Sequence, residues 1–226
     1  MAIPGTVRVV EDVTIAFADE VVAAFARRVN DVFSFALSGG ETARKCYEAL
    51  ARAGDRIDWW KVDFYWGDER CVPHDDPDSN YHLAREALLD RVGAANATHL
   101  MRCAEGPEPY QLRLGELGHL DLVHLGLGPD GHTASLFPES PALDADPGRL
   151  VSMNDDPLGN NPYRRMTLTF AGIARAHQVV VTVSGDSKAD ALARVAAGDD
   201  LPASRIDAES VLWLVDPAAA ADTDLG

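Results

Sequence analysis

Short apolar runs alternate along the chain with stretches in which apolar residues recur at helical spacing. The strand-like runs are 7–10, 32–37, 62–66, 120–128, 166–170, 178–185 and 211–216. Helical spacing marks 18–31, 41–54, 82–92 and 187–198, and a further helix is expected after residue 170, through Ala176. The run 120–128 is almost continuously apolar, which is typical of a strand buried on both faces. The alternation predicts an α/β fold, with a doubly wound, mostly parallel sheet and helices on both faces.

Composition narrows the classes of partner. The 226 residues are 46% hydrophobic, and we expect one domain over 1–226, with a frayed tail at 218–226. The 20 basic and 36 acidic residues give a net charge of −16, which argues against nucleic acid and against anionic membrane surfaces as partners. No apolar run approaches the roughly 20 residues of a membrane span. We therefore expect a small-molecule ligand, no nucleic-acid or membrane partner, and a monomer or weak homo-oligomer.

The cysteines and the first residues suggest a compartment. Cys46, Cys71 and Cys103 are an odd number and are too widely spaced for a disulfide framework or a metal knuckle. Residues 1–20 contain acids and a proline where a signal peptide needs a basic start and an apolar block. We expect a reducing, cytoplasmic location. The acidic loop 74–78 lacks the spacing of a calcium-binding loop, so we expect a solvated loop and no metal there.

A glycine turn follows the strand at 32–37. Ser38, Gly39 and Gly40 leave that strand and open the next helix, where Thr42 adds a second hydroxyl group. Two glycines allow close approach of the backbone to a ligand, and the first N–H groups of a helix point at an anion. The turn could therefore hold a phosphate. The alternative is a tight turn in which Ser38 or Thr42 only caps the helix.

A second glycine-rich segment, 126–131, matches the pattern G-x-G-x-x-G of dinucleotide-binding proteins. Pro129 has no N–H to offer a pyrophosphate, and Asp130 would place a negative charge beside it. The following helix, expected over 132–137, would end early at Pro138. We therefore expect no dinucleotide cofactor at this segment.

The same segment carries a candidate general base. His132 would lie in the first turn of the short helix, with Asp130 as its N-cap. The positive end of a helix dipole disfavours an imidazolium, so such a histidine tends to stay neutral and suits general-base chemistry. The alternative is a histidine that only packs or caps. Its place at the carboxyl end of a strand, among glycines, favours the functional interpretation.

Basic residues fall at the ends of other elements. Arg70 follows Asp68 and Glu69 after the strand 62–66, Arg165 precedes the strand 166–170, and Lys188 lies at a helix start. Each alone is typical of solvated surface charge, and the segment 68–70 could be a loop or an ion pair. A chain with a charge of −16 repels a phosphorylated ligand at long range, so such a ligand needs local cations. The three cations could supply that attraction.

Together these motifs resemble the 6-phosphogluconolactonase family. The resemblance runs from about residue 5 to 216 and rests on five segments: LSGGET (37–42), FYWGDERCVPHDDPDSNYHLAREALL (64–89), LGLGPDGHTASLFPES (125–140), RMTLT (165–169) and VTVSGDSKADAL (181–192). It implies a Rossmann-like fold, shared with glucosamine-6-phosphate deaminase and ribose-5-phosphate isomerase. It also implies an enzyme of the oxidative pentose phosphate pathway that hydrolyses 6-phospho-D-glucono-1,5-lactone to 6-phospho-D-gluconate.

The resemblance assigns provisional roles. His132 resembles the family's catalytic base, with Asp130 as its companion. Gly39, Gly40 and Thr42 match the family's phosphate loop. Arg70, Arg165 and Lys188 match its basic substrate-binding positions. Asp68 and Asn80 are members of its motifs, but the resemblance gives them no role. We add Ser38 from the glycine turn. A δ-lactone is an activated ester, so its hydrolysis needs neither a metal nor a redox cofactor.

Two alternatives remain at this stage. The deaminase of the same fold has a glutamate five residues after its histidine, whereas this chain has Phe137 there. A non-catalytic sugar-phosphate sensor would keep the phosphate cradle but gain nothing from His132.

Overall fold

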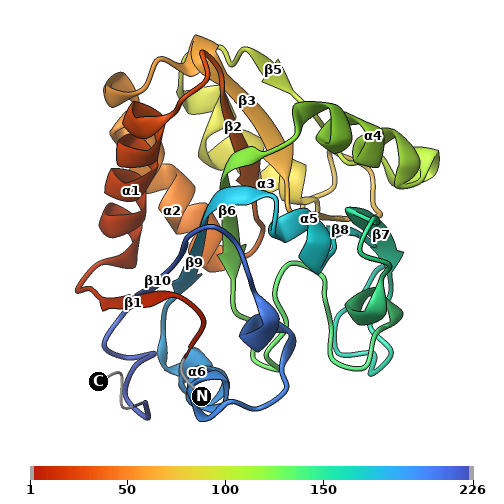
Figure 1. Cartoon of the computed structure of the whole chain (residues 1–226). Helices are drawn as coiled ribbons and strands as arrows, with labels where there is room; N and C mark the ends of the chain where they lie inside the picture. The colour runs from red at the N-terminus through yellow and green to blue at the C-terminus, as the bar shows by residue number, and fades with distance from the viewer. Residues whose placement is uncertain (1–2, 224–226) are drawn as a thin grey trace.

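A seven-stranded parallel sheet forms the centre of the computed structural model, which describes residues 3–223 (Figure 1). Its order is β1-β10-β9-β6-β2-β3-β5, and all the pairings are parallel. The strands are β1 (Thr6–Val9), β2 (Phe33–Leu37), β3 (Val62–Trp66), β5 (Ala97–Thr98), β6 (Leu120–Gly126), β9 (Ala176–Val183) and β10 (Val211–Val215). This parallel sheet, covered by helices on both faces, confirms the predicted α/β fold class.

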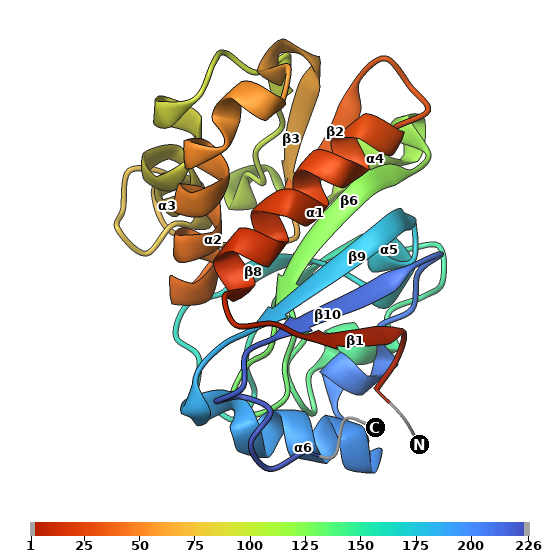
Figure 2. The ribbon, with the colours of Figure 1, turned by 90° about the vertical axis from the view of Figure 1, so that its left-hand side faces the viewer.

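Helices cover both faces of the sheet. One face carries α1 (Val13–Arg27), α2 (Glu41–Arg52) and α3 (Asn80–Ala87), and the other carries α4 (Glu108–Leu117) and α5 (Phe170–Ile173) (Figure 1). Helix α6 (Ala189–Ala197) lies beyond the end of the sheet (Figure 2). Helix α1 begins earlier than the spacing predicts, because the Asp12 carboxylate accepts hydrogen bonds from the backbone N–H groups of Thr14 and Ile15.

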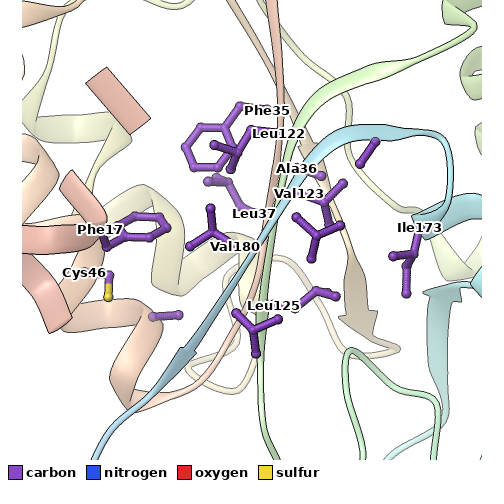
Figure 3. Packing of buried hydrophobic residues seen from close by; sticks show 14 of the residues in the cluster. Phe17, Phe35, Ala36, Leu37, Cys46, Leu122, Val123, Leu125, Ile173 and Val180 are labelled. Atoms are coloured by element: carbon purple, nitrogen blue, oxygen red, sulfur yellow. The ribbon is translucent and has the colours of Figure 1, made fainter. Parts of the chain in front are cut away.

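The core lies on both sides of the sheet because side chains alternate along each strand. Phe35 and Leu37 of β2 point toward α1, where Phe17 packs, whereas Ala36 points to the opposite face (Figure 3). On that face Ile173 of α5 lies across from the sheet (Figure 3). All five of these residues are fully buried. Burial on both faces explains why the central strands are almost continuously apolar in sequence.

A second, antiparallel sheet in the order β4-β8-β7 departs from the sequence prediction. Its strands are β4 (Asp68–Arg70), β7 (Val151–Asn154) and β8 (Arg165–Leu168). The strand predicted at 166–170 therefore belongs to this small sheet instead of the parallel one. It is joined to the end of β3 because the Leu168 N–H donates to the Gly67 carbonyl at 2.8 Å.

The short helix predicted over 132–137 is absent, so that prediction is wrong. Residues 129–137 form turns, with one isolated bridge between Thr133 and Leu136. Asp130 still accepts a hydrogen bond from the His132 backbone N–H, as an N-cap does, but no helix follows. The helix-dipole argument for His132 therefore does not apply, and the environment of its ring must be established from direct contacts.

The expectation of unpaired cysteines is also wrong. Cys71 and Cys103 form a disulfide, with Cα atoms 5.4 Å apart across a sequence separation of 32, and Cys46 is free and buried. Sequence spacing misled because the fold brings the segment after β4 next to the 3₁₀ turn at Cys103–Glu105. The cysteine argument for a reducing compartment is thereby lost. Within residues 3–223, no helix is both long and apolar enough to cross a bilayer.

The expected frayed tail at 218–226 lies only partly within the described residues. Ala219 is fully buried, and its backbone N–H donates to the Asp216 carboxylate at 2.8 Å. Residues 224–226 lie outside the described part of the chain.

Candidate active site

A cavity of about 230 Å³ opens at the carboxyl ends of the parallel strands. It lies between β2 and β6, the neighbouring strands from which the chain winds to opposite edges of the sheet, and open α/β sheets bind ligands at such a switch point. Its walls contain every predicted site residue except Asp130: Ser38, Gly39, Gly40, Thr42, Asp68, Arg70, His132, Arg165 and Lys188. The topology therefore gathers side chains that are up to 150 positions apart in sequence.

The glycine turn enters α2 as predicted. Gly40 is the N-cap residue with φ 92°, a left-handed conformation that favours glycine, and no side chain caps the helix. The alternative in which Ser38 or Thr42 caps it is therefore wrong. A methyl group on Gly39 would overlap the side-chain amide of Asn80, so only glycine fits against that amide. The first turn of α2 thus presents uncapped N–H groups to the cavity.

Buried polar groups support the glycine turn from below. The Ser38 N–H donates to the Tyr47 hydroxyl at 2.6 Å, and that hydroxyl lies 2.9 Å from Nδ1 of His124. Nε2 of His124 lies 2.9 Å from Oγ1 of Thr182. Burial lowers the pKa of His124 to about 3, so this ring stays neutral. These contacts tie the ends of β2, β6 and β9 together beneath the cavity.

His132 is held by Asp130 and by a glycine. Nδ1 of His132 lies 2.5 Å from Oδ1 of Asp130, which leaves Nε2 as the ring nitrogen available to the cavity. Burial opposes ionisation of Asp130, but its contacts with His132 outweigh it and lower the Asp130 pKa to about 2. The imidazole lies against Gly128, where a methyl group would overlap the ring. The Phe137 ring also meets the imidazole edge-on, with centroids 5.2 Å apart.

Asp68 lines the cavity and also anchors the turn after His132. Its Oδ2 accepts a 2.6 Å hydrogen bond from the Ser135 hydroxyl, and its Oδ1 accepts one from the Asn80 amide at 3.1 Å. Asn154 of β7 donates to the Ser135 carbonyl at 2.8 Å. The carboxylate therefore positions the histidine turn, in addition to whatever contact it makes with a ligand.

Glu69 is a residue whose role the sequence analysis missed. The segment 68–70 was expected to be a solvated loop, an ion pair or a clamp, yet Glu69 is 2% exposed. Its carboxylate accepts hydrogen bonds from the backbone N–H groups of Arg70, Asn80 and Tyr81 and from the Ser79 hydroxyl. Burial raises the pKa of Glu69 despite these bonds. Glu69 thus fastens the start of α3 to β4, and with it Asn80.

The three predicted cations lie around the cavity without close carboxylate partners. Arg70 donates to the Asp78 carbonyl at 2.6 Å, and Arg165 donates to the Pro162 carbonyl. None of the ion pairs found within residues 3–223 includes Arg70, Arg165 or Lys188. Burial lowers the pKa of Lys188, while Asp130 acts in the opposite direction. The charge of these side chains is therefore available to an anionic ligand.

Other cavity residues are not singled out by any sequence motif. Asn161 lies on the polar loop 153–165, which is expected to help build the site, but no pattern singles out this residue. His124 and Thr182 are typical members of buried strands. The position of His124, a polar residue inside an apolar strand, was the one feature that could have indicated its role. Across residues 3–223, no group of three or more His, Cys, Asp or Glu residues is arranged to hold a metal ion.

Comparisons with known proteins agree with this geometry. Residues 8–213 match the family described as glucosamine-6-phosphate isomerases/6-phosphogluconolactonase. The chain is 40% identical over 206 residues to the 6-phosphogluconolactonase of Synechocystis sp., with 82% of each protein covered. It is 37% identical over 179 residues to the GDH/6PGL endoplasmic bifunctional protein of Oryctolagus cuniculus, covering 73% of this chain and 22% of that protein.

A solved structure gives the same result. The crystal structure of 6-phosphogluconolactonase from Leishmania guyanensis superposes with a TM-score of 0.84 at 29% identity, covering 97% of this chain and 99% of that one. The matched region contains the glycine turn, the histidine turn and the three cations. The chain therefore belongs to the glucosamine-6-phosphate isomerase/6-phosphogluconolactonase family.

Proposed function

We propose that this protein hydrolyses 6-phospho-D-glucono-1,5-lactone to 6-phospho-D-gluconate, with His132 as general base. The observation that carries the proposal is one arrangement: a histidine held by a carboxylate at Nδ1 faces a cavity that also contains a glycine turn and three cations. The cations and the turn suit a phosphate, and the free Nε2 suits a proton transfer. The named 6-phosphogluconolactonases of similar sequence support the choice of substrate.

The reaction needs one proton to move twice. Nε2 of His132 takes a proton from a water molecule as that water attacks C1 of the lactone. The tetrahedral oxyanion is stabilised by N–H groups at the glycine turns or by a cation. The C1–O5 bond then breaks, and protonated His132 returns the proton to O5. The new carboxylic acid at C1 loses its own proton to the solvent, which gives 6-phosphogluconate and the acid release. Asp130 keeps the ring oriented and stabilises its positive charge between the two transfers.

The energetic demand on the site is modest. A δ-lactone also hydrolyses without a catalyst, so a general base worth roughly 10²–10⁴ in rate, together with positioning, is sufficient. Binding at the remote phosphate holds C1 near His132 and contributes to the rate without touching the reacting atoms.

The decisive experiment is turnover of freshly prepared 6-phosphogluconolactone, followed by acid release above the uncatalysed rate. We expect rapid hydrolysis of this substrate. We expect no acceleration above the uncatalysed rate when phosphate-free gluconolactone replaces it at the same concentration. Glucosamine-6-phosphate is the second comparison, because it tests a deaminase. Phe137 is 1% exposed and packs on the His132 ring, so that position offers no carboxylate for an isomerase or deaminase. Ammonia release from glucosamine-6-phosphate would contradict the proposal, and ligand binding without turnover would favour a sensor.

The cytoplasmic location and the monomeric or weakly oligomeric state remain predictions. Thiol trapping in intact cells tests the location, because Cys71 and Cys103 would be trapped as free thiols in a reducing compartment. Sedimentation equilibrium over a range of concentrations tests the oligomeric state.

A further inference from the structure

A loop between β7 and β8 borders the cavity and is organised by one carboxylate. Oδ1 of Asp156 accepts the Leu158 N–H at 2.9 Å. Oδ2 of Asp156 accepts both the backbone N–H of Asn161 at 2.8 Å and its side-chain amide at 2.9 Å. Because two bonds hold Asn161 to the same oxygen, the direction of its side-chain amide is defined. Asn161 is one of the residues that line the cavity.

The second N–H of the Asn161 amide reaches the partner of the proposed base. Nδ2 of Asn161 lies 3.4 Å from Oδ2 of Asp130. Oδ1 of Asp130 is occupied by Nδ1 and the backbone N–H of His132, at 2.5 and 3.2 Å. An amide nitrogen has two hydrogens, so it can serve Asp156 and Asp130 at the same time. Each oxygen of Asp130 therefore has its own donor.

The second donor matters because a cation at the same cavity attracts the Asp130 carboxylate. Lys188 faces the same cavity, and the Asp130 charge acts on it. A carboxylate that rotated toward Lys188 would release Nδ1 of His132 and would also neutralise a cation meant for the substrate. A long contact in the ligand-free site is compatible with this role, since such hydrogen bonds tighten in the reacting complex.

We propose that Asn161 is a positioning residue, which holds the second oxygen of Asp130 so that the carboxylate keeps Nδ1 of His132 and leaves Nε2 toward the cavity. Asn161 does not touch the reacting atoms in this scheme. The expected change in kcat rests on the proposed function. The expected contact between Asn161 and Asp130 does not depend on it.

The kinetic test compares two neighbouring asparagines. In Asn161→Ala we expect kcat to fall about tenfold, the order seen when residues behind a functional group are removed, with KM changed less than twofold. Asn160 is exposed on the same loop, so Asn160→Ala is the matched control and should retain both constants. A raised KM at unchanged kcat would make Asn161 a substrate-binding residue and overturn the proposal. Equal losses in the two variants would overturn it as well, because they would indicate general loosening of the loop.

A double-mutant comparison tests the route of the effect. If Asn161 acts through Asp130, Asn161→Ala should cost nothing further in an Asp130→Asn background. An undiminished tenfold loss in that background would show that Asn161 acts elsewhere.

A spectroscopic readout separates this inference from the proposed function. In ¹⁵N-histidine-labelled protein without substrate, the Nδ1–H of His132 should give a slowly exchanging proton signal, assigned by its loss in His132→Ala. Asn161→Ala should broaden or remove that signal, and Asn160→Ala should keep it. An unchanged signal in Asn161→Ala would overturn the inference even in an active enzyme. A changed signal would support it even if the lactone were not the substrate.

Discussion

Arg70 and Arg165 lie directly opposite each other in the antiparallel pair of β4 and β8. Directly opposed residues project to the same face of a sheet, so two positive charges adjoin at the cavity wall. Each guanidinium donates to a carbonyl oxygen and neither forms an ion pair within residues 3–223. Two adjacent like charges are unfavourable until an anion binds between or beside them.

Loss of Arg70 should therefore weaken ligand binding without weakening the fold. We expect Arg70→Ala to raise KM for the phosphorylated lactone by about 10- to 100-fold, the loss of one or two charge-assisted hydrogen bonds. The unfolding temperature of the ligand-free variant should equal or exceed that of the wild type. Inorganic phosphate should raise the unfolding temperature of the wild type more than that of the variant. A marked drop in stability without phosphate would show that Arg70 is structural.

Removal of the proposed base should separate catalysis from binding. We expect His132→Ala to lower kcat by about 10²–10⁴ and to leave binding of 6-phosphogluconate nearly intact, because the cations and the glycine turn remain. Calorimetric titration measures the binding, and acid release measures the turnover. Wild-type activity in the variant would remove His132 from the mechanism.

Gly128 offers a test of geometry that leaves every polar group in place. A methyl group there would overlap the His132 ring, whereas one on Gly115 of α4, which does not line the cavity, meets no atom within 4 Å. Gly128→Ala should displace the ring and lower kcat about 10²-fold, as a misplacement of about 1 Å can do. Gly115→Ala is the matched control and should retain activity. Similar kinetics in the two variants would mean that the ring position seen here is not the reacting one.

His124 should make the fold sensitive to acid. Its pKa is lowered from 6.5 to about 3 by burial, so the unfolded chain binds the extra proton between these values. Stability from the neutral ring is fully present above pH 6.5 and is lost as the pH falls below it. The slope is at most about 1.4 kcal/mol per pH unit for one group.

The measurement compares urea unfolding at pH 7 and pH 4.5. In His124→Leu the stability deficit relative to the wild type should shrink at the lower pH. A constant deficit in His124→Leu would contradict the assigned titration.

The disulfide should contribute measurably to stability. A cross-link across a separation of 32 residues removes about 3–4 kcal/mol of chain entropy from the unfolded state. The double variant Cys71→Ser/Cys103→Ser should therefore unfold about 10 °C lower than the oxidised wild type. Thiol titration of the denatured, unreduced protein should find only Cys46. Three reactive thiols would show that the bond is not formed in that preparation.

Local patterns sufficed for the parts of the molecule that depend on local physics. Burial on both faces makes Leu120–Gly126 an almost continuously apolar run, and the Gly39–Gly40 turn into α2 follows from backbone freedom. The motifs also located the cavity residues, since parallel strands end at one edge.

Long-range contacts explain what was missed. No pattern near Glu69 in the sequence indicates that its carboxylate accepts hydrogen bonds from backbone N–H groups at the start of α3, more than ten residues later. The 132–137 segment looks like a capped helix, but Ser135 is drawn instead to Asp68. Cys71 and Cys103, likewise, meet only because the tertiary structure brings them together.

The winding of the chain between β2 and β6 has a consequence for how activity is acquired. The two strands that flank the cavity touch each other, yet more than eighty residues of chain separate them. No hairpin or other local unit can assemble the cavity, so we expect a nascent or partly folded chain to be inactive. Substrate turnover is consequently a report on closure of the whole sheet, and ligands that occupy the cavity should protect distant strands from unfolding as readily as near ones.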